Sequence, residues 1–256
     1  MQELKTSDYK LENYQKIYDY YRNYKPDANK IRFAANLLRF IYNPQVEISE
    51  EALSQATEHV NQNKPIIYAH NHVRIRDQFV VGTAIWAIEE LKNNLLKGVV
   101  IPAKSSYFTG KSKLLIPTKI LEGVGMLPVF RSTDLYGESS DLFKDSTEAY
   151  IDTCAFQLNN GINILVTPEG TRNIKDPSKI LNIKQGIAKT AIRACNLGVE
   201  PLILPAAVNY SDEKFGFYKP DVYFGKPIFV NSKDSVLNIT QELQTNLQES
   251  VDYFNN

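Results

Sequence analysis

The chain has few of the residues that build disulfide frameworks and metal centres. Its 256 residues include two cysteines and three histidines. Cys154 and Cys195 fall in unrelated helical patterns, without the short spacing of metal ligands. We therefore expect two reduced, buried thiols of a cytosolic protein rather than a disulfide scaffold or a cysteine-based zinc site.

The chain also has no excess of charge of either sign and no long apolar run. Lys and Arg number 29, as do Asp and Glu, so overall charge does not indicate a nucleic-acid partner. No uninterrupted apolar stretch approaches the ~18–20 residues that span a bilayer. The polar, Tyr-rich start predicts no signal peptide.

From Pro65 onward, apolar runs typical of strands alternate with helical patterns. This alternation predicts an α/β fold with a largely parallel sheet flanked by helices. The expected strands are 66–69, 99–102, 127–130, 162–166 and 202–208, with a short late pair at 221–224 and 227–230. The expected helices are 77–93, 146–159, 185–197 and 240–254.

The preceding residues, 1–62, are interpreted as an N-terminal helical extension, which leaves an α/β domain at 63–256. Pro26 ends a first helical pattern, and Asp27 is placed to cap a second helix. Residues 31–42 are apolar almost all round. Such a helix either docks on the core or lies in a membrane interface with its arginines toward anionic headgroups. Its polar stripe consists of Arg32, Asn36, Arg39 and Asn43.

The most informative segment is AHNHVRIRD, which follows an apolar run and contains Asn71, His72 and, five residues after His72, Asp77. Five residues along a helix correspond to about 500°, so two side chains at this spacing point roughly 140° apart. They can meet if His72 lies in the turn and Asp77 in the first turn of the next helix. A carboxylate held there fixes the imidazole tautomer of a general base. The alternative is a polar loop whose aspartate is favoured by the helix dipole.

Two further segments, GVGMLPVFR at 123–131 and LVTPEGTR at 165–172, place charged residues after apolar runs. With Asn71-His72-x4-Asp77, they resemble the blocks of the 1-acylglycerol-3-phosphate acyltransferase family, also called the glycerolipid or lysophospholipid acyltransferases. The family's second block, Gly and then Arg six residues later, is matched by Gly125 and Arg131. Its third, Phe-Pro-Glu-Gly-Thr-Arg-Ser, is matched from Pro168 to Arg172, and its fourth, an apolar strand with a proline, at 202–208.

The resemblance runs in the family order from about residue 64 to about residue 227, with departures inside the blocks. Thr167 replaces the usual Phe, and Asn173 replaces the usual Ser. Phe130 stands where some members carry an acidic residue, and Pro128 where many carry an aromatic one. These differences leave the identity of the acyl acceptor open.

The resemblance implies an α/β sandwich with some antiparallel strands, and hence a mixed, largely parallel sheet. It implies transfer of a fatty acyl group from acyl-CoA or acyl-acyl carrier protein to the hydroxyl of a lysophospholipid. The first choice of acceptor is 1-acylglycerol-3-phosphate, which gives phosphatidic acid, and no metal or cofactor is expected besides the acyl donor. His72 would be the general base, held by Asp77. Substrate binding is expected of Asn71, Gly125, Arg131, Glu169, Gly170, Thr171 and Arg172.

The implied partners are the acyl donor, the lysophospholipid acceptor and a membrane surface, with no nucleic acid. Many members carry a membrane span, so we expect a cytoplasmic protein peripherally associated with the inner face of the membrane. Three alternatives stay open: an acyltransferase for glycerol-3-phosphate or another lysolipid, a non-catalytic membrane-binding protein on this scaffold, and a metal site. The metal site would use His70 and His72, but a catalytic metal typically needs three or more ligands, and the remaining histidine, His59, lies upstream.

Overall fold

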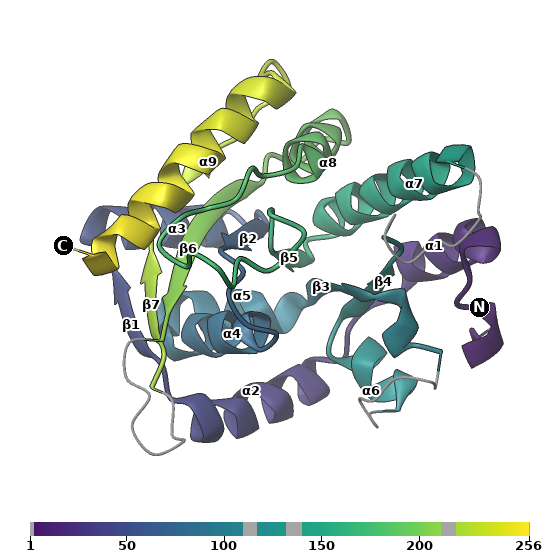
Figure 1. Cartoon of the computed structure of the whole chain (residues 1–256), viewed down its shortest axis with the longest axis horizontal. Helices are drawn as coiled ribbons and strands as arrows, with labels where there is room; N and C mark the ends of the chain where they lie inside the picture. The colour runs from purple at the N-terminus through teal and green to yellow at the C-terminus, as the bar shows by residue number, and fades with distance from the viewer. Residues whose placement is uncertain (1–2, 110–116, 132–139, 211–218, 256) are drawn as a thin grey trace.

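The computed structural model describes residues 3–109, 117–131, 140–210 and 219–255. Its centre is one mixed sheet with helices on both faces (Figure 1). The strands, in the order of the chain, are β1 (Gln45–Ile48), β2 (Ile66–His70), β3 (Val99–Lys104), β4 (Met126–Val129), β5 (Asn163–Val166), β6 (Leu202–Asn209), β7 (Asp221–Phe224) and β8 (Ile228–Phe229).

Helices α7, α8 and α9 cover one face, and α4 and α5, with α2 outside α4, cover the other (Figure 1). The α-helices are α1 (Tyr14–Asn23), α2 (Ala28–Tyr42), α3 (Glu50–Asn61), α4 (Asp77–Ala87), α5 (Glu89–Lys97), α6 (Thr118–Gly123), α7 (Ser140–Asn159), α8 (Gly186–Asn196) and α9 (Val236–Asp252). Short 3-10 turns are η1 (Thr6–Asp8), η2 (Leu11–Asn13), η3 (Ser105–Tyr107) and η5 (Tyr253–Asn255).

The order of strands across the sheet is β1-β7-β6-β2-β5-β3-β4, with β8 also paired to β6. β2 runs parallel to both of its neighbours, β5 and β6, and β3 runs parallel to β5 and β4. β7 and β8 are antiparallel to β6, so the prediction of a mixed, largely parallel sheet is confirmed. The carboxyl ends of β2 to β6 therefore share one edge, which we call the C-terminal edge.

The expected strands all occur, but four parts of the secondary structure differ from the predictions. The helix expected at 146–159 already begins at Ser140. β1 and α6 were not expected, so the N-terminal segment contributes a strand as well as helices. The helix expected at 77–93 is two helices, because Ile88 adopts an extended backbone between α4 and α5. The helix expected at 240–254 begins at Val236, where the Ser235 hydroxyl accepts a hydrogen bond from the Asn238 N–H.

β2 lies in the middle of the sheet, and its burial is consistent with this position. All five residues of β2 are buried, as expected for an apolar run covered on both faces. The buried Asn163 supports its start, because its side-chain oxygen accepts a hydrogen bond from the Ile66 N–H at 2.9 Å. Of the two cysteines, Cys154 is buried as expected, whereas Cys195 is partly exposed, so the expectation of burial is wrong for Cys195.

Helix α2 is apolar on two opposite faces. Asp27 caps it as predicted, because its side chain accepts hydrogen bonds from the N–H groups of Asn29 and Lys30. One face buries Ile31 and Ala35 and packs against α4. The other face is exposed and carries Phe33, Leu37, Phe40 and Ile41. Across the described parts of the chain, no helix combines the length and apolarity needed to cross a membrane.

Gly125 has a backbone that only glycine fits. Its φ is +90°, and a Cβ at this position would meet the Val99 carbonyl oxygen at 1.7 Å. Gly161 also has a positive φ, +77°, but an added Cβ there meets nothing within 4 Å. An alanine at position 161 would therefore cause backbone strain alone, whereas an alanine at position 125 would cause both strain and a steric clash.

We expect Gly125→Ala to lower the free energy of unfolding by more than ~3 kcal/mol, since β3 and β4 would have to separate. Gly161→Ala should cost only the strain of a left-handed alanine, ~1–2 kcal/mol. Urea unfolding followed by circular dichroism measures both. Equal losses in the two variants would contradict the close approach at Val99.

Candidate active site

The His72 and Asp77 side chains meet in the arrangement that their spacing requires. His72 lies in the turn after β2, and Asp77 is the first residue of α4. His72 Nδ1 and Asp77 Oδ2 are 3.1 Å apart. The His72 side chain is 17% exposed and that of Asp77 is 0% exposed, so the imidazole can reach a ligand while its carboxylate partner is shielded from water.

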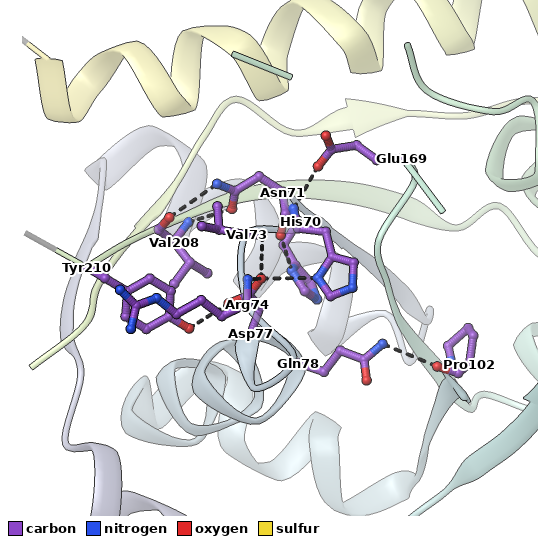
Figure 2. Close-up of polar contacts among 11 residues, drawn as sticks. His70, Asn71, Val73, Arg74, Asp77, Gln78, Pro102, Glu169, Val208 and Tyr210 are labelled. Atoms are coloured by element: carbon purple, nitrogen blue, oxygen red, sulfur yellow. Dashed lines mark hydrogen bonds and ion pairs between the residues drawn. The ribbon is translucent and has the colours of Figure 1, made fainter. Parts of the chain in front are cut away.

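The Asp77 carboxylate has further donors on both oxygens (Figure 2). Oδ2 accepts hydrogen bonds from the N–H groups of Val73 at 2.6 Å and Arg74 at 2.7 Å. Oδ1 accepts one from the Tyr210 hydroxyl at 2.6 Å. Burial alone would raise the pKa of Asp77, but the hydrogen bonds from His72 and Tyr210 outweigh it and hold the pKa below its usual value.

The Asn71 side chain continues the pairing of β2 with β6 beyond the end of β2. Its oxygen accepts a hydrogen bond from the Val208 N–H at 2.8 Å, and its amide nitrogen donates to the Val208 carbonyl at 3.2 Å. Asn71 is only 2% exposed. The Asn71 side chain thus makes the hydrogen bonds to β6 that a backbone would make in a regular strand pair. The backbone of His72 is not needed for this pairing and turns out of the sheet.

Glu169 joins this turn to the loop that follows β5. Its carboxylate accepts hydrogen bonds from the N–H of His72 at 2.7 Å and from that of Leu181 at 2.9 Å. The N–H of Asn173 donates to the His72 carbonyl at 2.7 Å, so both backbone polar groups of His72 are held by the same loop. Burial raises the pKa of Glu169, which is 2% exposed.

Pro168 is buried, whereas the last three residues of the third block face solvent. Gly170 has a φ of +66°, and it is exposed together with Thr171 and Arg172. Arg172 follows β5, which lies next to β2 in the sheet. Arg172 therefore belongs to the loop that holds the His72 backbone.

Gly125 and Arg131 flank β4, which lies three strands from β2. Neighbouring strands are about 4.8 Å apart, so β4 lies about 14 Å from β2 across the sheet. The Arg131 side chain is exposed at the C-terminal edge, and Lys104 ends β3 between the two strands. A ligand that contacts both His72 and Arg131 must therefore extend along this edge.

The other two histidines have no direct part in this arrangement. His70 is fully buried, its Nδ1 lies 2.8 Å from the Asn71 carbonyl oxygen, and burial lowers its pKa to about 4. His59 is buried in α3 and its Nε2 lies 3.1 Å from the Pro65 carbonyl oxygen, at the opposite edge of the sheet. No group of three or more His, Cys, Asp or Glu side chains suited to a metal ion occurs within the described ranges.

Tyr210 is the residue of this site that the sequence analysis missed. It follows β6 directly, and no motif in the sequence contains it. The signal that would find it is topological, because β6 is the parallel neighbour of β2 and their carboxyl ends lie together. A polar side chain just past β6 is thus a candidate partner for the turn after β2.

The fold and site define a class: an α/β protein with a His-Asp pair at the open, carboxyl edge of its central parallel strands. A family model described as "Acyltransferase" matches residues 52–209. The chain belongs to this acyltransferase family.

Comparison with solved structures supports the fold. The crystal structure of the 1-acyl-sn-glycerophosphate (LPA) acyltransferase PlsC from Thermotoga maritima is similar to this chain, with a TM-score of 0.56 and 15% sequence identity. The match covers 89% of this chain and 78% of that one. A comparison with curated proteins gives no match.

Glu169→Gln should loosen the loop that holds His72. An amide can offer one acceptor oxygen but not two, so either the His72 or the Leu181 N–H loses its partner. We expect a lower melting temperature and faster hydrogen exchange at one of these two amides. Glu200→Gln is the control, since Glu200 forms an ion pair at the opposite edge. Unchanged exchange at both amides would show that Glu169 does not clamp the turn.

Proposed function

We propose that this acyltransferase moves a fatty acyl group from a thioester, acyl-CoA or acyl-acyl carrier protein, to the hydroxyl of 1-acylglycerol-3-phosphate. The observation that carries the proposal is the His72–Asp77 pair, with its 3.1 Å contact and a partly exposed imidazole. The family supplies the type of reaction, and the order of the four blocks supports the choice of a phosphorylated acceptor.

His72 acts as a general base in this proposal. Because the Asp77 carboxylate only accepts hydrogen bonds, the Nδ1 of His72 carries a proton and Nε2 is the basic nitrogen. Nε2 removes the proton of the acceptor hydroxyl as its oxygen attacks the thioester carbonyl. The C–S bond then breaks, and the imidazolium returns the proton to the departing thiolate. General acid–base catalysis of this kind contributes about 10²–10⁴-fold.

The oxyanion of the intermediate needs hydrogen-bond donors. The N–H groups of His72, Val73 and Arg74 are engaged with carboxylates. The Gly170 N–H donates to the Thr167 carbonyl. The candidate donors are side chains at the C-terminal edge, the N–H groups of Thr171 and Arg172 along the Gly170 turn, and those of Ile75 and Arg76 at the start of α4.

The phosphate of the acceptor is assigned to the arginines of the second and third blocks. Guanidinium binds phosphate oxygens in a bidentate manner. Arg172 is the nearer in strand order, and Arg131 lies about 14 Å away across the sheet by strand spacing. Glycerol-3-phosphate is the second candidate acceptor, because it offers the same phosphate without the acyl chain.

We expect purified wild-type protein to transfer a labelled acyl group to 1-acylglycerol-3-phosphate, and His72→Ala to lose at least 10²-fold in kcat. Glycerol-3-phosphate and lysophosphatidylglycerol are assayed alongside, with CoA and carrier-protein donors. His59→Ala is the matched control, because His59 lies at the opposite edge of the sheet. Full activity of His72→Ala would refute the base assignment, and a wild type inactive with every donor and acceptor would favour the membrane-binding alternative.

We further propose that helix α2 places this protein on the inner face of the membrane. Its exposed face carries Phe33, 71% exposed, and Phe40, 90% exposed. The helix contains three basic residues and no acidic one, which suits an anionic lipid surface.

The end of α2 also lies at the same edge of the sheet as the proposed active site. Gln45, just after α2, pairs with Asp221, and Asp221 pairs with Asn209 at the end of β6. The carboxyl end of α2 is therefore at the C-terminal edge, where His72 lies. A bilayer against α2 would place its headgroups near this edge.

We expect the double variant Phe33→Ser, Phe40→Ser to bind vesicles of phosphatidylcholine and phosphatidylglycerol at least tenfold more weakly, because each buried Phe side chain contributes about 1.5–3 kcal/mol. Phe229→Ser is the control, since Phe229 is 57% exposed at the opposite edge. Vesicle flotation measures both. Equal binding of the double variant and wild type would exclude α2 as the docking element.

A further inference from the structure

Tyr210 makes two separate contacts with the loop that carries His72. Its hydroxyl donates to Asp77 Oδ1 at 2.6 Å, on the carboxylate oxygen that His72 does not use. Its ring lies under the Arg74 guanidinium, with 4.5 Å between the guanidinium carbon and the ring centroid. Figure 2 shows Tyr210 reaching the loop from the end of β6. The loop is thus held from β6 as well as from β5.

The chemistry of these contacts favours a fixed donor rather than a reacting group. Burial and the nearby Asp77 carboxylate raise the pKa of Tyr210, so its hydroxyl keeps its proton. A protonated phenol beside an ionised carboxylate forms a charge-assisted hydrogen bond, which is short and strong. The backbone of Tyr210 is itself held, because its N–H donates to the Asn209 side-chain oxygen at 2.9 Å.

We propose that Tyr210 is a positioning residue for acyl transfer: its hydroxyl fixes the Asp77 carboxylate so that the opposite oxygen faces His72 Nδ1. This inference rests on the proposed function of the His72–Asp77 pair. Without the hydroxyl, Oδ1 loses its hydrogen-bond donor and the carboxylate can rotate away from the imidazole ring. The stacking of Arg74 on the ring still holds the loop in place. The angle of the Asp77 carboxylate, however, is no longer set from β6.

The test compares Tyr210→Phe with Tyr9→Phe. The Tyr9 hydroxyl also donates to a buried carboxylate at 2.6 Å, that of Glu122, but it joins the N-terminal segment to α6. Tyr210→Phe keeps the ring under Arg74 and removes only the hydroxyl. We expect about a tenfold loss of kcat in Tyr210→Phe with little change in the KM for the acyl donor, and wild-type kinetics in Tyr9→Phe.

The pKa of Asp77 separates a positioning role of Tyr210 from a general loosening of the loop. The hydrogen bond from Tyr210 lowers the pKa of Asp77, so its removal raises that pKa. We therefore expect the Asp77 carboxyl to titrate at higher pH in Tyr210→Phe than in wild type. The charged and titratable groups around Asp77 are His70 from β2, His72, Arg74 and Arg76 from the loop, Glu169 from the loop after β5, and Tyr210 from the end of β6.

Titration of the Asp77 carboxyl by carbon NMR gives a readout that does not require turnover. If wild-type protein transfers no acyl group, the proposed function fails, while a raised Asp77 pKa in Tyr210→Phe still supports the positioning contact. If Asp77 titrates identically in wild type and Tyr210→Phe, or if the kinetics of Tyr210→Phe equal those of Tyr9→Phe, the role of Tyr210 is refuted.

Discussion

The Asp77 carboxylate is the group on which the geometry of the site depends. It is fully shielded from water and accepts four hydrogen bonds, three from the preceding loop and one from Tyr210. An unpaired buried carboxylate is costly, so these donors and the amino end of α4 must be present together. The same contacts that keep Asp77 ionised shape the loop and orient the His72 ring.

The sheet makes this arrangement possible. β2 is parallel to β5 and β6, so the segments after the three strands leave the sheet at one edge. Each neighbour sends one side chain to the turn after β2: Glu169 holds the His72 backbone, and Tyr210 holds Asp77. Asn71 completes the support by pairing with Val208. The His72 side chain is thereby fixed while its backbone stands outside the regular ladder.

The parts of the structure that depend on local patterns could be predicted from the sequence. The apolar runs gave the strands from β2 onward, and the 3.6-residue period of a helix predicted how His72 and Asp77 must lie in order to meet. β1 could not be found this way, because it has only four residues and is defined by its pairing with β7, which lies far along the chain. The contact between Tyr210 and Asp77 depends on the order of the strands, which no spacing in the sequence reveals. For α2 the sequence left docking and exposure open, and the structure shows one apolar face on α4 and the other exposed.

We propose that ionised Asp77 sets the tautomer of His72. Nitrogen NMR of the imidazole in wild type and Asp77→Asn tests it most directly, because it reports which ring nitrogen carries the proton. We expect a proton on Nδ1 and an unprotonated Nε2 in wild type at neutral pH, and a mixture of tautomers in Asp77→Asn. A wild-type ring protonated on Nε2, or the same tautomer in both proteins, would contradict it.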